Sequence, residues 1–174
     1  MNTLSILIVV FFIFLILKYW TQIFGAGYDP TPQKIAMKML EMADLKKKEI
    51  LYDLGCGDGR FLILGAKKFG ARGIGIDISP LRYTWAKINV KLNNLSDKIK
   101  IKHGNFFKFS ISDADVVALF LFEPTNRKLS EKFKKELKPS ARIVSYYWKI
   151  PGLKPSEIDK KYHIYLYKMK DQFN

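Results

Sequence analysis

The sequence predicts an α/β fold with a mostly parallel, doubly wound sheet, preceded by one transmembrane helix. After residue 48, short apolar segments alternate with stretches of helical periodicity, which is the order that builds a parallel sheet. Before residue 18 the chain carries no charged side chain. The expected divisions are a transmembrane anchor at 1–24, a hinge and lead-in helix at 25–48, and one domain at 49–174.

The amino-terminal segment has the length and composition of a single membrane span. Residues 3–23 reach the roughly 20 residues that a helix needs to cross a bilayer. Lys18 can extend its amine toward the headgroups, and Tyr19 and Trp20 fall where an aromatic belt would lie. The basic residues that follow place the domain on the cytoplasmic side. A cleaved signal peptide ending near 24–27 and a buried helix are the alternatives, so retention of the segment is open.

The remaining elements follow from periodicity and capping signals. Thr31 is expected to cap a helix that starts at Pro32 and runs to about Asp44. Ser79 should cap another, with Pro80 in its first turn. The apolar strand at 116–122 is expected at the centre of the sheet. Strands are expected at 50–54, 74–78, 99–103, 116–122, 143–148 and 163–169, and helices at 60–69, at 80–93 and around Leu129, Phe133 and Leu137.

The composition indicates which partners the chain favours and which kinds of site it lacks. The chain has 30 basic and 16 acidic residues, a net charge of +14, and all the basic residues except Lys18 lie after residue 27. This excess favours nucleic acid, an acidic protein or an anionic membrane surface, or it is simply a lysine-rich solvated surface. The single cysteine, Cys56, excludes an internal disulfide. One cysteine and two distant histidines predict no metal site.

A glycine-rich segment at 52–60 carries the strongest chemical signal. It reads Tyr-Asp-Leu-Gly-Cys-Gly-Asp-Gly-Arg, and it follows a strand and opens a helix. Its Gly-x-Gly-x-Gly spacing differs from dinucleotide sites, and it lacks the Lys-Ser/Thr pair of a phosphate-binding P-loop. Asp77 ends the second strand, where an acid can accept both ribose hydroxyls of a nucleoside. After the third strand, Asn105 could read an adenine edge and Phe106 could pack on its face.

Together these motifs resemble the class I S-adenosylmethionine-dependent methyltransferases, which have a Rossmann-like fold. The resemblance extends over 28–169. Four segments sharpen it, and they lie at 28–32, 53–60, 104–107 and 135–145. They look like the archaeal protein-lysine methyltransferases, which are similar to the membrane-anchored mitochondrial lysine methyltransferases and, more distantly, to the Dot1-type histone enzymes. The resemblance therefore implies a lysine side chain as the methyl acceptor.

The resemblance also implies which residues bind S-adenosyl-L-methionine. The methionine part would lie against the glycine-rich segment, the ribose against Asp77, and the adenine against Asn105 and Phe106. The implied cofactor residues are Tyr28, Thr31, Asp53, Gly55, Gly57, Asp58, Gly59, Asp77, Asn105 and Phe106. Asp77 stands where the archaeal relatives often have Glu. The segment 122–126 and the shorter carboxyl end also depart from their pattern, and both departures concern the acceptor.

Two segments should end at the carboxyl edge of the sheet, where open α/β sheets bind ligands. Glu123 is expected to orient the acceptor amine, and Tyr146 or Trp148 to line its channel. Glu123 could equally act as a helix-start acid, and the aromatic rings could simply pack on the strand. A desolvated aromatic channel would favour the neutral lysine amine that methyl transfer requires. Neither His103 nor Cys56 is expected to act in catalysis.

Four functions stay open on the sequence alone. The first is methylation of lysine on a membrane-associated protein, near which the anchor would hold the enzyme. The second is methylation of a lipid, a quinone or another small molecule. The third is methylation of RNA, which the charge favours, although 122–126 lacks the Asn/Asp-Pro-Pro-Tyr motif of many base-amine methylators. The fourth is a cofactor-binding assembly factor without turnover. The oligomeric state and the acceptor's identity are not predicted.

Overall fold

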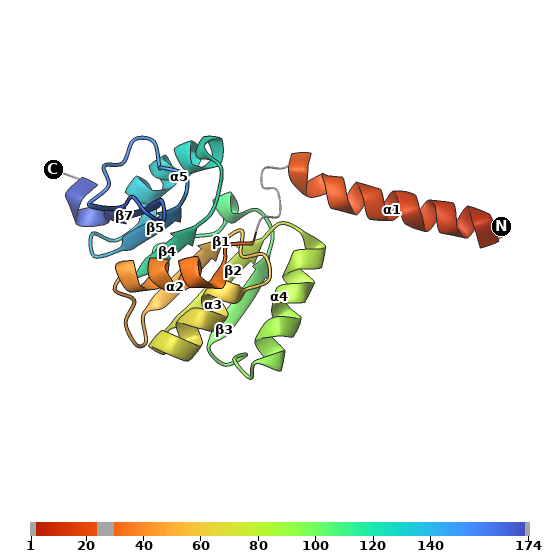
Figure 1. The fold of residues 1–174 in the computed structure, drawn as a ribbon, viewed down its shortest axis with the longest axis horizontal. Coiled ribbons are helices and arrows are strands. Elements are labelled where there is room, and N and C mark those ends of the chain that lie inside the picture. The colour runs from red at the N-terminus through yellow and green to blue at the C-terminus, as the bar shows by residue number, and fades with distance from the viewer. Residues whose placement is uncertain (1–2, 24–29, 173–174) are drawn as a thin grey trace.

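The computed structural model describes residues 3–23 and 30–172, and its second part forms a three-layer α/β domain (Figure 1). Seven strands form one sheet in the order β3-β2-β1-β4-β5-β7-β6. The first five strands along the chain pair in parallel, whereas β7 is antiparallel to both β5 and β6. The strands are β1 (Ile50–Leu54), β2 (Arg72–Asp77), β3 (Ile99–His103), β4 (Val116–Leu119), β5 (Arg142–Tyr146), β6 (Glu157–Asp159) and β7 (Ile164–Lys168). The predicted mostly parallel α/β fold is confirmed.

Helices cover both faces of this sheet. The α-helices are α1 (Thr3–Ile23), α2 (Gln33–Met42), α3 (Arg60–Leu64), α4 (Pro80–Leu92) and α5 (Glu123–Glu136). One buried cluster joins Leu40 of α2, Leu62 of α3 and Ala86 of α4 to one face of the sheet, and a second joins Leu129 and Phe133 of α5 to the other. Because strand side chains alternate between faces, β1 and β4 contribute to both clusters. All four residues of β4 are buried, as expected for a central strand.

The helix starts test the two capping predictions. The cap of α4 is confirmed: the hydroxyl of Ser79 accepts a hydrogen bond from the amide of Arg82 at 3.4 Å, and Pro80 occupies the first turn. The cap of α2 was wrong. Pro32 itself is the capping residue, no side chain accepts a hydrogen bond there, and the carbonyl of Thr31 is instead held by Arg60.

Several predicted boundaries shift by a few residues. The fourth strand ends at Leu119, and the following residues lead into α5, which begins at Glu123. The fifth strand ends at Tyr146 because Tyr147 has a left-handed backbone with φ of +64°, which an extended strand cannot accommodate. The predicted helix at 60–69 is α3 followed by a short π-helix, η1 (Gly65–Phe69). The short strand β6 was not predicted.

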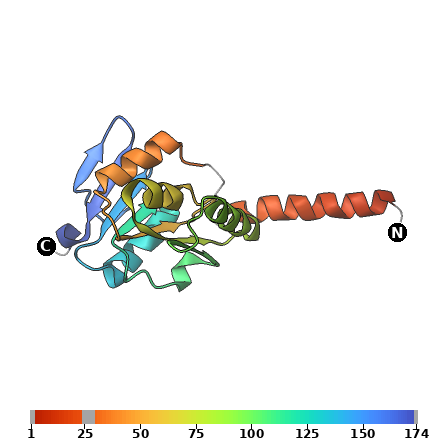
Figure 2. The same ribbon diagram turned by 90° about the horizontal axis from the view of Figure 1, so that it is seen from below.

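The amino-terminal segment is helical, and Figures 1 and 2 show α1 extending away from the domain. Its apolar side chains between Leu4 and Phe14 are largely exposed. Over residues 3–23 and 30–172, no helix combines the length and hydropathy needed to span a membrane. The predicted transmembrane helix is therefore not confirmed. The domain boundaries proposed at residues 24 and 48 stay predictions.

Candidate functional site

The predicted cofactor residues gather at the carboxyl edge of the parallel strands. Asp53 lies near the end of β1, Asp77 ends β2, and Asn105 follows β3. The strand order reverses at β1, which lies between β2 and β4 although β2 follows it along the chain. Open α/β sheets bind ligands at such a reversal. The fold therefore brings three separate sequence motifs to one binding edge.

The loop between β1 and α3 requires glycine where it turns. The φ angles of Gly55 and Gly57 are +84° and +54°, a region that side chains other than glycine rarely adopt. A Cβ atom on Gly55 would also lie 3.3 Å from Cδ2 of Leu121. The loop consequently exposes backbone without side chains, which allows a ligand to approach closely.

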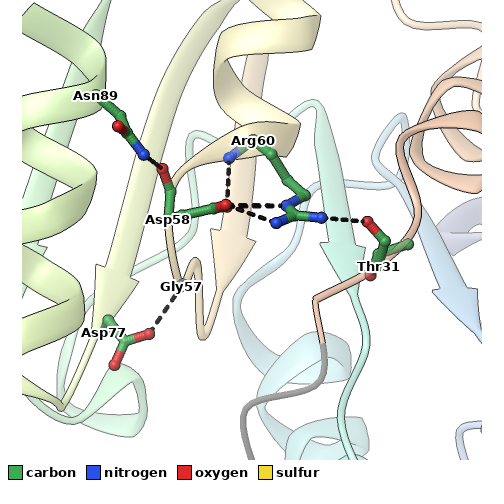
Figure 3. Close-up of polar contacts among 6 residues, drawn as sticks. All are labelled: Thr31, Gly57, Asp58, Arg60, Asp77 and Asn89. Carbon is green, nitrogen blue, oxygen red and sulfur yellow. Dashed lines mark hydrogen bonds and ion pairs between the residues drawn. The ribbon is translucent and has the colours of Figure 1, made fainter.

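Asp77 holds this loop in place. Its side chain is buried, and one carboxylate oxygen accepts a hydrogen bond from the amide of Gly57 at 2.9 Å (Figure 3). The other oxygen accepts from the amide of Ser79, also at 2.9 Å. One carboxylate thus fixes both the glycine loop and the start of α4. Each oxygen retains a second lone pair. Asp77 therefore supports the loop, and its role as the acceptor of ribose hydroxyls stays a prediction.

The carboxyl group of Asp53 has a raised pKa. Burial raises the pKa of this carboxyl to about 8, helped by the neighbouring carboxylates of Asp77 and Asp58 and opposed by Arg60. Without a ligand the carboxyl is therefore largely protonated at neutral pH. A cationic ligand would favour the ionised form. This suits a molecule that carries both a sulfonium and an ammonium group.

Arg60 links the loop to the segment that leads into the domain, a role that the sequence reasoning missed. Its guanidinium donates to both carboxylate oxygens of Asp58, with the shortest contact at 2.6 Å, and to the carbonyl of Thr31 at 2.8 Å (Figure 3). The carbonyl of Asp58 in turn accepts from Asn89 on α4 at 3.0 Å. Asp58 thus organises the loop through Arg60 and Asn89. An arginine directly after the third loop glycine was the available signal.

We expect Arg60→Lys to weaken cofactor binding about tenfold. Lysine keeps the charge but cannot bridge a carboxylate and a carbonyl with one planar fork. Calorimetric titration with S-adenosylhomocysteine measures the effect. Arg127→Lys, which changes an exposed arginine paired with Glu123 on α5, serves as the matched control and should leave the affinity unchanged. Unchanged affinity in Arg60→Lys would contradict the linking role.

The residues predicted to bind adenine are more exposed than the glycine loop's support Asp77. The side chain of Asn105 is exposed and accepts a hydrogen bond from the amide of Phe107 at 3.0 Å, so its oxygen caps a short turn. Its amide nitrogen is the group that could read an adenine edge. Phe106 is partly buried, with its ring centroid 4.9 Å from that of Phe107. Tyr28 lies outside the residues that the structure describes.

The predicted acceptor residues lie at the ends of β4 and β5. Glu123 is the first residue of α5, and its carboxylate pairs with Arg127 at 3.0 Å in an exposed position. Tyr146 contacts Phe120 with ring centroids 4.7 Å apart, and Trp148 contacts Phe122 at 5.8 Å. Aromatic side chains from two neighbouring strand ends therefore form one cluster. Its members are Phe120, Phe122, Tyr146, Tyr147, Trp148 and His163.

A strained turn presents the outermost ring of this aromatic cluster. The amide of Trp148 donates to the carbonyl of Tyr146 at 2.7 Å, which closes a three-residue turn around the left-handed Tyr147. The hydroxyl of Ser145 donates to the carbonyl of Trp148 at 2.6 Å, and Asn126 donates to the next carbonyl at 3.2 Å. These contacts hold a conformation that tyrosine otherwise avoids. Sequence reasoning missed Tyr147 because its backbone angle has no sequence signature.

The sequence predicts no catalytic role for His103 or Cys56, and the structure shows what each side chain contacts. The ring of His103 contacts the carbonyl of Ile78 at 3.1 Å and lies 5.4 Å from the ring of Tyr83. Cys56 is buried, and burial raises the pKa of its thiol far above the ordinary value. A thiol with a raised pKa is a weak nucleophile.

The glycine loop, the buried carboxylate of Asp77 that supports it and the preference of Asp53 for a cationic ligand fit S-adenosylmethionine. Held at the strand-order reversal of a Rossmann-like sheet, they define a class I S-adenosylmethionine-dependent methyltransferase. Residues 53–157 match the model of the ANTKMT methyltransferase domain. The chain belongs to this family of S-adenosylmethionine-dependent enzymes.

Relatives of known description support the same class. The chain is 41% identical over 147 residues to a "Protein-lysine N-methyltransferase" of Saccharolobus islandicus, covering 80% of this chain and 91% of the relative. A "Ribosomal protein L11 methyltransferase" of Alkaliphilus oremlandii is 31% identical, but the match spans only 38% of that protein. A Salinibacter ruber structure described as an RNA methyltransferase with bound S-adenosylhomocysteine superposes with a TM-score of 0.78 at 35% identity, covering 81% of this chain and 94% of that one.

Proposed function

We propose that this methyltransferase acts on the ε-amino group of lysine in a protein. The observation that carries the proposal is the 41% identity, over most of both chains, to a protein named for lysine N-methylation. The aromatic cluster at the ends of β4 and β5 adds support, because an apolar surface favours the neutral amine over lysine's charged form.

In this reaction the residues align an amine with an already activated methyl group. S-adenosylmethionine supplies a methyl group bound to a sulfonium sulfur. The amine nitrogen forms the new N–C bond, and the sulfur keeps the electron pair of the broken S–C bond. The aromatic cluster is proposed to lie against the amine and to shield it from water. The proton that the nitrogen carries after transfer leaves to solvent. Alignment alone can supply a large part of the acceleration.

Glu123 is proposed to orient the acceptor amine through its carboxylate. Its pairing with Arg127 is exposed, and exposed pairs contribute only about 0–1 kcal/mol, so an incoming ammonium or amine can replace the arginine. We expect Glu123→Gln to lower kcat/KM for the acceptor about tenfold or more without changing cofactor affinity. Glu131→Gln, an exposed acid paired with Lys134 on the same helix, is the control. Full turnover in Glu123→Gln would rule out this role.

Tyr147 is proposed to contact the acceptor directly. Replacing it by glycine removes a ring that is 53% exposed. The replacement also removes backbone strain, because a left-handed conformation costs residues other than glycine about 1–2 kcal/mol. We therefore expect Tyr147→Gly to leave the free energy of unfolding within about 1 kcal/mol of the parent. The acceptor KM should rise while the cofactor affinity stays constant. Denaturant unfolding and steady-state kinetics measure both, and an unchanged acceptor KM would contradict the contact.

RNA is the second candidate acceptor. The Salinibacter ruber structure described as an RNA methyltransferase supports it, together with the net charge of +14. The test adds tritiated S-adenosylmethionine and the full-length protein to an extract from cells that lack this protein. The location of the label distinguishes a protein acceptor from an RNA acceptor. Label in the protein fraction supports the proposal, whereas label confined to RNA or to lipid overturns it.

Action at a membrane is a further part of the proposal. It is supported by α1, in which Leu7, Val10 and Phe14 are each more than half exposed and whose first 15 residues carry no charge. An apolar surface of this kind favours a lipid environment over water. In cell fractionation we expect the full-length protein to sediment with membranes and to resist extraction by salt.

A further inference from the structure

The helix α4 carries an apolar stripe on its outer face. Leu81, Trp85, Ile88 and Leu92 are 55%, 56%, 43% and 75% exposed, and their spacing places them on one narrow side of the helix. The opposite side of α4, represented by Ala86 and Val90, packs into the core. The fold therefore needs only the inner face, and the outer stripe has no packing role in the domain.

Basic side chains border this stripe on both sides. Lys87 and Lys91 are exposed on α4 itself, one turn apart. On the other side a groove of about 450 Å³ separates α4 from α3 and η1, and it is lined by Lys67, Lys68 and Asn89 among other residues. An apolar strip between basic borders is the pattern of a helix that lies in a membrane interface. A tryptophan within the strip agrees with this, because indole prefers that depth.

The helix α4 also lies on the side where the chain leads into the domain. Gln33, at the start of α2, lines the same groove as Asn89 of α4. Asn89 is joined through the backbone of Asp58 and the side chain of Arg60 to Thr31 (Figure 3). In Figures 1 and 2, α4 faces the side from which α1 extends. The helix that carries the stripe thus lies on the same side of the domain as the apolar helix α1.

We propose that α4 docks the domain on the surface of an anionic lipid bilayer. The four apolar side chains of the stripe enter the boundary between headgroups and acyl chains, and the lysines on its borders contact lipid phosphates. A second copy of the chain fits this surface poorly, because a symmetric contact would bring the lysines of both copies together. The bilayer accounts for the stripe, the charge and the position of α1 at once.

Docking through α4 would also orient the active site. The helix begins three residues after Asp77, at the carboxyl edge of the sheet where the cofactor residues gather. The end of the stripe at Leu81 therefore lies close to that edge. An enzyme held in this way reaches acceptor groups near the lipid surface. The docking itself does not depend on whether the acceptor is a lysine.

The test measures the fluorescence of Trp85 in the full-length protein. Vesicle binding alone would not be enough, because α1 could hold the protein on vesicles by itself. Trp20→Phe and Trp148→Phe leave Trp85 as the single tryptophan. Vesicles of phosphatidylcholine and phosphatidylglycerol with brominated acyl chains quench a tryptophan that enters the bilayer. We expect about a twofold loss of Trp85 fluorescence and a shift to shorter wavelength, both weaker on phosphatidylcholine alone. Unquenched Trp85 in protein that co-floats with the vesicles would overturn the proposal.

Further variants separate docking from other causes. In the same background, Lys87→Glu with Lys91→Glu should reduce quenching on anionic vesicles. The matched change Lys160→Glu with Lys161→Glu, in the turn after β6, should not. Unchanged quenching in the α4 pair would count against the proposed surface. A concentration-dependent blue shift without vesicles would instead identify a second copy as the occupant and overturn the proposal. Retained S-adenosylhomocysteine binding shows that each variant is folded.

Discussion

Asp77→Asn is expected to weaken S-adenosylhomocysteine binding by about two orders of magnitude. The asparagine side chain presents an NH₂ group in place of one carboxylate oxygen, so the amide of Gly57 or Ser79 loses its acceptor. A buried donor left without a partner costs about 1–3 kcal/mol. The loss of charge-assisted hydrogen bonds to the ribose hydroxyls adds to this. Isothermal titration calorimetry measures the combined effect.

The matched control is Asp159→Asn. Asp159 also accepts hydrogen bonds from two backbone amides, those of Lys161 and Tyr162, but it lies on the edge strand β6, which four other strands separate from β2 and Asp77. It makes the same substitution outside the proposed site, where both amides bond to one oxygen that asparagine retains. We expect its cofactor affinity to equal that of the parent. Equal affinities in both variants would refute the assignment of Asp77 as ribose ligand and loop support.

The second large effect is a pH dependence of cofactor affinity. The pKa of Asp53 is about 8 in the free protein, because burial and two neighbouring carboxylates disfavour its charge. A bound sulfonium and ammonium would favour the carboxylate, so binding below pH 8 must release a proton. The affinity for S-adenosylmethionine should therefore rise about tenfold per pH unit from pH 6 toward 8 and then level off.

The same titration affects the stability of the free protein. The pKa of Asp53 in the folded protein lies above the value of about 4 for an unfolded aspartate. The contribution of the protonated carboxyl to the free energy of unfolding is therefore complete below about pH 4 and is lost as the pH rises through 8.

Asp53→Asn should remove most of the pH dependence of cofactor binding between pH 6 and 8. Titrations in buffers of different ionisation enthalpy count the released proton directly. A slope unchanged by Asp53→Asn would exclude this carboxyl as its source.

Much of the fold followed from the sequence because its signals are local. Alternation of strands and helices predicted the parallel sheet, the uninterrupted apolar run predicted the buried strand β4, and the pair Ser79-Pro80 predicted the start of α4. The cofactor edge followed as well, since carboxyl ends of parallel strands meet at one edge. The cap at Thr31 failed because a distant residue, Arg60, holds that segment instead of a local hydroxyl.

The features that escaped prediction depend on contacts between distant residues. Nothing local indicates that Tyr147 adopts a left-handed backbone, because the conformation is held by Ser145 and by Asn126 of another element. Asp53 is a strand residue in the sequence, and only its burial beside Asp58 and Asp77 raises its pKa. The stripe on α4 likewise reads as core in a sequence, because helical spacing does not say which face is exposed.

The acceptor that we propose is the amine of a lysine side chain. The direct measurement is amino-acid analysis of the protein fraction after transfer from tritiated S-adenosylmethionine, with one sample acetylated beforehand to block its lysine amines. We expect the label to elute as methyl-lysine and to disappear after acetylation. Label in another methylated residue, or label that survives acetylation, would contradict it.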